Sequence, residues 1–438
     1  MTSAKENERL TNSAPGTPIG EVLRRSWQPA ALTDELGGPR PVIPVRMLGE
    51  DFVLFRDEQG RLGLIGRHCA HRGADLCYGR LEDGGLRCPF HGWLYDVNGQ
   101  CLQQPAEPEG STAYRRLRHR AHPCVEHNGV VFAYLGPGDP PAFPAFDCFA
   151  APREHSFAFK GLWACNWLQA LEVGIDPAHA SFLHRFFEDE STDRAYGQQF
   201  RAAAADTGLP LTRILREHSR PTIRVQDTNY GFRLVTTRSL DASRTHYRIT
   251  NLVFPNAITI PMSNDMIITQ WHVPIDNSNC YWYSIFTSFE ATVDRETMRD
   301  QRLANQTLPD YRPKANRSNS WGFDSTEQLT MTYTGMGRDI NIHDQWAVES
   351  PGPIVDRTME HLGKSDVGII KYRKLLQHAA KSLQNGGALP FALAASEAAQ
   401  ARGPIALDAV GPAGDHDNFW QQCDQERRAK STWARRTQ

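Results

Sequence analysis

Two short pairs of metal-binding side chains stand close together in the sequence. Cys69-x-His71 and Cys88-x-x-His91 each combine one thiol with one imidazole. Two thiolates and two imidazoles suit a tetrahedral zinc ion, and they also suit a [2Fe–2S] cluster with the cysteines on one iron and the histidines on the other. A zinc finger of the familiar kind pairs like with like, whereas each pair here is mixed. The spacing therefore favours a cluster held between two loops, with zinc as the alternative.

A second group of potential ligands follows further along the chain. Asp176, His179 and His184 form a D-x-x-H-x₄-H pattern. Two histidines at this spacing are, by themselves, more often packing residues. Ferrous iron that activates oxygen is, however, typically held by two histidines and one carboxylate, with open positions for O₂ and the substrate. The chemistry of such a site would need a carboxylate from elsewhere in the chain.

The spacing of the two histidines also constrains the backbone. In a regular α-helix each residue turns the chain by about 100°, so His179 and His184 would point roughly 140° apart. They could not then share one metal ion. We therefore expect a π-type turn or a break between Asp176 and Arg185, which Pro177 favours.

At these residues the chain resembles a known family. CAHRG followed by CPFHGW is similar to the Rieske motif of ring-hydroxylating oxygenases, and the segment from Asp176 to His184 is similar to their mononuclear iron motif. Rieske proteins of respiratory chains usually carry one more cysteine in each loop, where this chain has Ala74 and Phe90. The chain is identified as a member of the phthalate dioxygenase-like group of catalytic α subunits.

The resemblance implies a third ligand for the iron. INIHDQWAVES is similar to the late segment that supplies the carboxylate, which makes Asp344 the ligand and Glu349 a supporting residue. Without the resemblance, Asp344 reads as a helix N-cap. The neighbouring His343 is expected beside the ligands or on the surface.

The resemblance also assigns a role to Asp176. Its carboxylate is implied to hydrogen-bond the free ring nitrogen of His179 or His184 and, across a subunit boundary, that of His91. In the family, the cluster of one subunit feeds the iron of its neighbour, usually within a cyclic homotrimer or a dimer of such trimers. Asp176 would then connect the two metal sites.

The activity implied by the resemblance is that of a terminal oxygenase. It would use O₂ and electrons that come ultimately from NAD(P)H through a separate flavin or iron–sulfur reductase. The [2Fe–2S] cluster is the relay and a mononuclear Fe(II) is the reactor. The expected reaction is ring dihydroxylation of a phthalate- or benzoate-type acid. Alternatives are O-demethylation or aryl-ether cleavage of a methoxy- or phenoxy-substituted acid, a Rieske protein that only transfers electrons, and a zinc-stabilised binding module.

An aromatic acid in an apolar pocket needs an arginine or several hydrogen-bond donors for its carboxylate. Arg248 is the first candidate, because strand alternation places Tyr247 and Ile249 on the opposite face. Arg213 and Arg224 are the next candidates.

Composition limits the remaining possibilities. The chain has 438 residues, 40% of them hydrophobic and 22% charged, which is typical of a globular protein with two or three domains. The formal net charge of −2 gives no reason to expect nucleic-acid binding. The polar N-terminus and the absence of a long apolar run predict a cytoplasmic protein, and the nine scattered cysteines fit a reducing compartment.

These residues need two different frameworks to position them. Residues 7–36 read as a helical lead-in, and short β-branched and aromatic runs between 41 and 137 predict a small antiparallel β domain. Alternating runs between 210 and 300 predict a large antiparallel sheet, followed by an amphipathic helix. The expected class is α+β, with a β Rieske domain and, by resemblance, a helix-grip catalytic domain. The expected divisions are an arm at 1–40, the Rieske domain at 41–150, the catalytic domain at 151–385 and a peripheral tail at 386–438.

Overall fold

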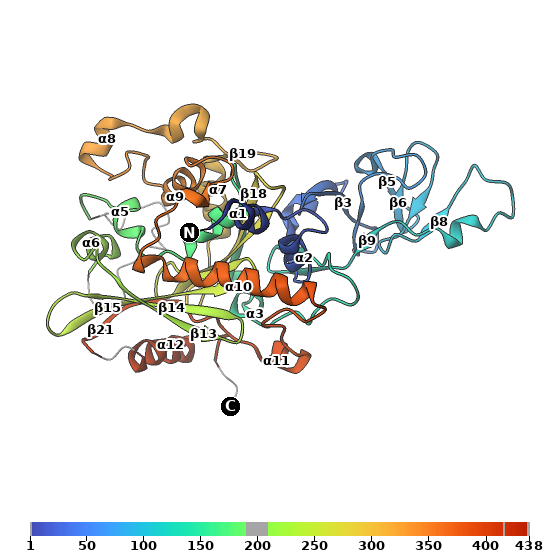
Figure 1. Ribbon diagram of the computed structural model, residues 1–438. Coiled ribbons are helices and arrows are strands. Elements are labelled where there is room, and N and C mark those ends of the chain that lie inside the picture. Colours follow the sequence, from blue (N-terminus) through green and yellow to red (C-terminus); the bar gives the residue numbers. More distant parts are fainter. Residues whose placement is uncertain (1, 190–208, 415–416, 436–438) are drawn as a thin grey trace.

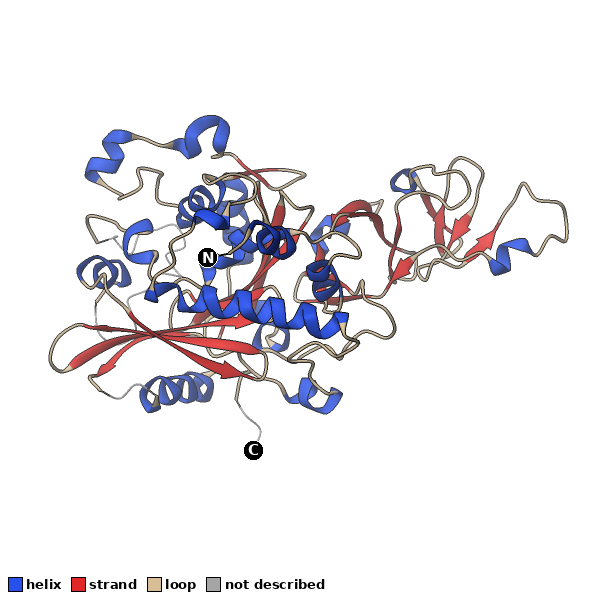
Figure 2. Ribbon diagram, in the orientation of Figure 1, coloured by secondary structure: helices blue, strands red, loops and turns tan. Residues whose placement is uncertain are grey.

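The computed structural model describes residues 2–189, 209–414 and 417–435. Figure 1 shows two lobes, a large one that contains most of the helices and a narrow one, built from strands, that projects from it. Antiparallel sheets are present in both lobes and the helices are concentrated in the large one (Figure 2), so the expected α+β class is confirmed.

The N-terminal arm is helical over only part of its expected length. Helices α1 (Ala4–Thr11) and α2 (Pro18–Arg24) form it, and the Thr17 hydroxyl caps α2 by accepting a hydrogen bond from the Gly20 amide. The lead-in then becomes a strand, β1 (Gln28–Leu32), which pairs with the last strand of the narrow lobe. The helical prediction was therefore wrong for Gln28–Leu32, whereas Thr33–Leu36 does form a short 3-10 helix. Pro29, which lacks an amide hydrogen, sits where the pairing register shifts.

The narrow lobe consists of three small antiparallel sheets, ordered β2-β3-β4-β9, β5-β6-β7-β8 and β1-β11-β10. A compact apolar core beneath the metal-ligand loops includes Phe55, Ile65, Trp93 and Tyr95. The strands are β2 (Val42–Met47), β3 (Glu50–Arg56), β4 (Leu62–Gly66), β5 (Arg80–Glu82), β6 (Gly85–Arg87), β7 (Leu94–Tyr95), β8 (Cys101–Gln103), β9 (Ala121–His122), β10 (Cys124–His127) and β11 (Val130–Ala133).

The large lobe is organised around one antiparallel sheet with the order β12-β18-β17-β16-β15-β14-β13. A separate two-stranded ribbon, β19 (Gln306–Thr307) with β20 (Arg312–Pro313), lies outside it. The strands of the large sheet are β12 (Ser156–Trp163), β13 (Thr222–Thr228), β14 (Gly231–Ser239), β15 (Arg244–Val253), β16 (Ala257–Pro261), β17 (Met266–Pro274) and β18 (Cys280–Ser288).

Helices cover this sheet on both sides (Figures 1 and 2). The long helix α10 (Val367–Gln384) crosses one face, where Gly368 allows close approach to Leu234 and the Tyr372 hydroxyl donates to the Pro255 carbonyl at 2.6 Å. Burying a side chain of this size stabilises the fold by roughly 1.5–3 kcal/mol. The other helices of this lobe are α3 (Asp147–Ala150), α4 (Trp167–Gly174), α5 (Ala180–Leu183), α6 (Leu211–Glu217), α7 (Arg295–Ala304), α8 (Ser325–Thr330), α9 (Ile340–Glu349), α11 (Ala395–Gln400) and α12 (Asn418–Lys430).

The C-terminal segment is part of the fold, which corrects the expected peripheral tail. Strand β21 (Leu407–Pro412) pairs with the first half of β15, while β16 pairs with its second half. Helix α12 then packs its Trp420 against Tyr247 and Ile249, on the far side of the sheet. The tail is held because β15 is longer than β16 and needs a second partner strand along the same edge.

Candidate active site

The two loops with mixed cysteine–histidine pairs have the same backbone design. The Cys69 amide donates to the Ala74 carbonyl and the Cys88 amide to the Trp93 carbonyl, both at 2.8 Å. In each loop a glycine four residues after the cysteine donates back to the cysteine carbonyl, Gly73 at 2.8 Å and Gly92 at 3.0 Å. Both glycines have φ close to +75°, a conformation that costs other residues about 1–2 kcal/mol.

This design brings the four side chains together. Cys69 and Cys88 are buried, and burial raises the pKa of the Cys88 thiol. The imidazoles of His71 and His91 lie side by side at the outer end, with ring centroids 4.5 Å apart, and His71 stacks on Trp93. Two sulfurs inside and two nitrogens outside fit a Rieske [2Fe–2S] cluster, with the cysteines on the inner iron and the histidines on the outer one.

Tyr95 is a residue of this site that sequence reasoning missed. Its hydroxyl lies 3.3 Å from the Cys69 sulfur, and burial followed by the hydrogen bond with Cys69 raises the pKa of this phenol well above its ordinary value. The hydroxyl is thus a proton donor beside one sulfur. Tyr95 lies in strand β7, two residues after Trp93 of the second loop, and this closeness in sequence was the only indication that it belongs to the site.

The second group of ligands converges from two helices. The Nε2 atoms of His179 and His184 lie 3.2 Å apart, and Asp344 Oδ1 lies 3.7 Å from the first and 3.2 Å from the second. Among the described residues, Asp344 Oδ1 is buried without a hydrogen-bond donor, and burial raises the pKa of this carboxyl to about 6. Two imidazoles and one carboxylate aimed at one point fit a divalent iron with open coordination positions.

The expected break in the helix is present between the histidines. Helix α5 is a single turn over Ala180–Leu183, and His179 precedes it in α-helical conformation. His184 follows the turn with φ −104° and ψ 25°, outside the helical region. This departure from helical geometry brings the two side chains to one point although they are five residues apart.

Asp176 makes a different contact from the one expected within this chain. The Nδ1 atom of His179 hydrogen-bonds to the backbone carbonyl of Asp176, whereas the nearest carboxylate oxygen is 3.9 Å away. The other carboxylate oxygen accepts from the Ala178 amide at 2.9 Å and closes the turn that contains Pro177. The carbonyl, instead of the carboxylate, therefore sets the orientation of His179.

The residues on either side of Asp344 lie inside the protein. His343 is buried, stacks on His184 and hydrogen-bonds through Nε2 to the Gly337 carbonyl at 2.9 Å. Burial lowers the pKa of His343 to about 4, so the ring is neutral near pH 7. The hydrogen-bond partners found for the Glu349 carboxylate do not include Asp344. This carboxylate accepts from the Ala164 amide and the Trp321 indole, and so fixes the end of α9 against the start of α4.

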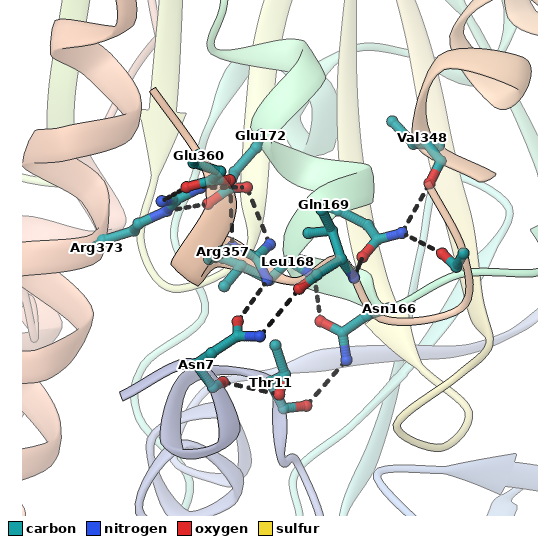
Figure 3. Close-up of polar contacts among 12 residues, drawn as sticks. Asn7, Thr11, Asn166, Leu168, Gln169, Glu172, Val348, Arg357, Glu360 and Arg373 are labelled. Carbon is teal, nitrogen blue, oxygen red and sulfur yellow. Dashed lines mark hydrogen bonds and ion pairs between the residues drawn. The ribbon is translucent and has the colours of Figure 1, made fainter. Parts of the chain in front are cut away.

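A buried polar network fixes α4 and α9 relative to each other (Figure 3). Gln169 donates to the Val348 carbonyl at 2.7 Å and so links α4 to the end of the helix that carries Asp344. Glu172, further along α4, accepts from Arg357 at 3.0 Å and from Arg373 at 2.6 Å. Burial alone would raise the pKa of Glu172, but the two guanidinium groups outweigh it and lower the pKa.

The N-terminal arm belongs to the same network. Asn7 of α1 donates to the Val355 carbonyl at 2.9 Å and accepts from Arg357 at 3.1 Å (Figure 3). The segment that follows α9 is therefore held by the N-terminal arm and by α4, whose Gln169 accepts from the Val355 amide at 2.8 Å. The position of Asp344 depends on these distant contacts.

All three arginines expected to bind substrate have carboxylate partners in the protein. Arg213 pairs with Asp189, and Arg224 pairs with Asp417 at the exposed edge of the sheet. Arg248 pairs with the buried Asp408 of β21 and donates to the Pro261 carbonyl at 3.1 Å. Tyr247 and Ile249 lie on the opposite face of β15 from Arg248, as predicted. The charges of Arg213, Arg224 and Arg248 are, however, already paired with carboxylates of the protein.

Arg238 is the arginine that the sequence reasoning missed. It is 1% exposed, and its Nη2 donates to the Pro177 carbonyl at 3.1 Å and contacts the Ser181 hydroxyl at 3.4 Å, both in the segment that carries the histidines. Its Nε and Nη1 are buried and have no partner among the described residues. Burial, and then repulsion from Arg248, lowers the pKa of Arg238 to about 10, so it remains a cation at neutral pH.

The two metal-ligand sites lie far apart in the folded molecule, one in each lobe. In Figure 1 the cluster loops belong to the β5–β8 end of the narrow lobe, whereas α5 and α9 lie in the large lobe, away from that end. Tyr78 and Phe90, beside the cluster loops, are 74% and 55% exposed. Among the described residues, no helix is long and apolar enough to cross a membrane.

Comparisons with known proteins agree with this architecture. Residues 26–122 match the family model of the Rieske [2Fe–2S] domain, and residues 133–429 match the model described as LigXa C-terminal domain like. The oxygenase subunit of phthalate 4,5-dioxygenase from Pseudomonas putida is 34% identical over 88% of this chain and 88% of its own length. The α subunit of phenoxybenzoate dioxygenase from Ectopseudomonas oleovorans is 33% identical over 86% of each chain.

Other relatives and solved structures are named for different substrates. The oxygenase subunit of a tert-butanol monooxygenase / tert-amyl alcohol desaturase from Aquincola tertiaricarbonis is 32% identical over 86% of this chain and 77% of its own. NdmA of Pseudomonas putida CBB5, a mutant with caffeine, has a TM-score of 0.58 at 18% identity, covering 87% of this chain and 97% of that one. Dicamba monooxygenase bound to dicamba gives 0.55 at 17% identity, covering 83% and 99%.

Proposed function

We propose that the substrate is an aromatic carboxylic acid oxidised at the site of His179, His184 and Asp344, because the chain belongs to the phthalate dioxygenase-like Rieske oxygenases, as an oxygenase (α) subunit. Proteins of this class are oxidoreductases with a Rieske cluster and a mononuclear iron. We assign the cluster to the two mixed loops and the iron to these three side chains, whose chemistry fits each group.

The observation that carries the choice of substrate is Arg238. It is a buried cation with two unpartnered nitrogen atoms, and it contacts the backbone and side chain of the segment that holds both histidines. A carboxylate can accept two hydrogen bonds from one guanidinium group, which is the strong form of such a contact. Bound in this way, an aromatic acid would be anchored by its carboxylate close to the proposed iron ligands.

The chain's own residues would hold the iron and position the substrate. The iron supplies the activation of O₂ when bound. Asp344 and the two histidines leave coordination positions open, the Asp176 carbonyl holds His179 in one tautomer, and Arg238 anchors the substrate. Ring dihydroxylation is the reaction proposed, with O-demethylation or aryl-ether cleavage as the alternative, since both begin from the same anchored acid.

Arg238→Gln tests this proposal. With a surrogate reductase and a panel of benzoates, phthalates, methoxybenzoates and phenoxybenzoates, the variant should raise KM for the best acid by roughly 10–100-fold, which corresponds to the loss of a charge-assisted hydrogen bond. The methyl ester of the same acid should be affected far less. Arg224→Gln, at the exposed edge, is the matched control and should leave KM unchanged. An unchanged KM in Arg238→Gln would exclude the arginine as the anchor, and product analysis would identify the reaction.

We further propose that electrons reach the iron from the cluster of a neighbouring copy within a homotrimer, and reach the cluster from a separate reductase. Support comes from the separation of the two sites in one chain and from the exposed Tyr78 and Phe90 beside the cluster loops, since exposed aromatic side chains mark interaction surfaces. Asp176 has one carboxylate oxygen that is not used to close its own turn, and it is proposed to accept a hydrogen bond from His91 of the neighbour.

Asp176→Asn tests this route. The variant should retain cluster and iron, because the His179 contact is made by the backbone carbonyl, yet it should lose turnover. Iron and acid-labile sulfide analysis, EPR of the reduced cluster and single-turnover rates measure these effects separately. Retained turnover would contradict the relay, and loss of iron would make Asp176 a structural residue of the iron site.

A further inference from the structure

A second cavity lies away from both metal-ligand sites, between the two lobes. It has a volume of about 360 Å³. It is lined by the chain after α2, by β11, by the linker at residues 139–149, by the start of β16 and the middle of β17, and by the segment at residues 388–393 after α10. Drug-sized ligands occupy cavities of this order. None of the proposed metal ligands, nor Arg238, contributes to its lining.

The walls of this cavity are aromatic. Trp27 packs against Phe143 with ring centroids 5.8 Å apart, and Phe149 lies 5.7 Å from Trp271. Phe391 also lines the cavity, packs against Phe254 with ring centroids 5.8 Å apart, and has a φ of +64°, which is unusual for a residue with a side chain. Flat apolar walls of this kind favour a planar ring, since aromatic pairs gain from stacked and edge-to-face contacts.

One cation stands among these rings. Arg25 lines the cavity near the Tyr134 hydroxyl, whose pKa is raised by burial and lowered in part by this guanidinium. Its Nε is buried and has no hydrogen-bond partner, and the described part of the chain offers it no ion pair. Asp139, the other charged residue of the lining, is exposed to solvent. The Trp27 indole is already bonded to the Pro141 carbonyl, so Arg25 is the free donor group of this part of the cavity.

We infer that this cavity is a second, non-catalytic binding site for a small planar aromatic carboxylate, with the ring between Trp27, Phe149 and Phe391 and the carboxylate on Arg25. The combination of apolar walls and one unpartnered guanidinium group matches that ligand class better than a neutral ring, which would leave the buried Nε unpaired. A bound acid would contact the linker and the segment at 388–393 together, and so would tie the two lobes to each other. This inference rests on the proposed function only for the choice of benzoate as a probe.

Equilibrium dialysis of the holoenzyme with labelled benzoate, without reductant so that no turnover occurs, tests the inference. The wild type should bind two benzoates per chain. Arg25→Gln should bind one benzoate, at the Arg238 site. Arg238→Gln should also bind one benzoate, at the Arg25 site. Arg25→Lys keeps the charge but not the paired geometry and should retain the second site with weaker affinity. Arg46→Gln, at an exposed arginine of β2, is the matched control and should bind two.

The outcomes separate this inference from the proposed function. Two benzoates bound to Arg25→Gln, or only one bound to the wild type and lost in Arg238→Gln, would overturn the second site. A third outcome is that the wild type binds one benzoate, which is lost in Arg25→Gln and kept in Arg238→Gln. This would support the second site and contradict Arg238 as the substrate anchor near the iron. Anisole serves as the neutral probe. If the second site binds anisole but not benzoate, and binds anisole equally well in the wild type and in Arg25→Gln, the carboxylate assignment would be overturned.

Discussion

The cluster loops and the iron site solve the same problem, the positioning of metal ligands, in opposite ways. Each cluster loop closes on its own backbone within six residues, with a cysteine at its start, a left-handed glycine and a returning hydrogen bond. The iron site instead brings Asp344 of α9 to the short turn α5 through contacts made by Gln169, Glu172 and the N-terminal arm. Local sequence decides the first geometry, and long-range packing decides the second.

The largest effect should come from removing the long-range ligand. Asp344→Ala takes away the only carboxylate of the described three-residue ligand group. Metal coordination contributes several kcal/mol to the stabilisation of charge in a transition state, so turnover should fall by more than about 10³-fold. Iron analysis should show one iron lost per chain while the visible spectrum of the cluster is unchanged. A loss of the cluster spectrum would contradict the independence of the two regions.

The network that supports the iron site should be the next most sensitive part. Glu172→Gln removes the carboxylate that Arg357 and Arg373 share, and Arg373 keeps Glu360 as its remaining partner. The free energy of unfolding should fall by about 3 kcal/mol, the lower end of the range for breaking a buried ion pair. The pKa of Glu172 is lower in the folded protein than in the unfolded chain. The ionised carboxylate therefore stabilises the fold at pH values above the unfolded-state pKa, and this stabilisation is lost as the pH falls through the folded-state pKa. Denaturant unfolding at pH 7 and at pH 3.5 should therefore show a smaller difference between variant and wild type at the lower pH.

The glycines of the cluster loops test the local design. Gly73→Ala and Gly92→Ala each force a side chain into the left-handed region, at a cost of about 1–2 kcal/mol. A methyl group at Gly73 meets open space, whereas at Gly92 it lies 3.1 Å from Pro105 Cγ, so Gly92→Ala should be the more damaging. Melting temperature and sulfide content measure the effect. Gly363→Ala, at an ordinary backbone conformation with no contact closer than 3.7 Å, should change neither.

The smallest effect should come from the hydrogen bond beside the cluster. Tyr95→Phe removes the hydroxyl near the Cys69 sulfur and should lower the reduction potential, because hydrogen bonds to cluster sulfurs favour the reduced, more negative state. A differential contribution of about 1 kcal/mol corresponds to roughly 40 mV for one electron. Protein-film voltammetry measures the potential, and an unchanged value would show that the Tyr95 hydroxyl does not donate to the sulfur.

The features that the sequence predicts are those decided by local sequence, and the features that it does not predict are those decided by long-range packing. The mixed pairs and the capped start of α2 at Thr17 depend on neighbours a few residues apart, so the sequence carries them directly. The break between His179 and His184 was predictable from helix geometry alone. Each of these features is decided by local backbone conformation.

Features decided by distant partners were not predictable in this way. Arg248 was a reasonable anchor until β21 placed Asp408 beside it, and nothing near Arg248 in the sequence indicates that pairing. Arg238 was accessible to reasoning, because alternation along β14 puts it on the same buried face as Phe232 and Leu234. The hydrogen bond from His179 to the Asp176 carbonyl, in place of the carboxylate, depends on atomic detail that a motif does not contain.

Strand β21 links the pairing of the large sheet to the charge around the proposed substrate anchor. Asp408 neutralises Arg248 and hydrogen-bonds His246 at 2.8 Å, which leaves Arg238 as the cation of that region with unpartnered donor atoms. A chain in which β21 has not paired would have an excess of positive charge inside its sheet and an unpaired edge along the first half of β15. Such an edge is a template for pairing with other chains. Selectivity for an anion and resistance to aggregation would thus depend on the same short strand.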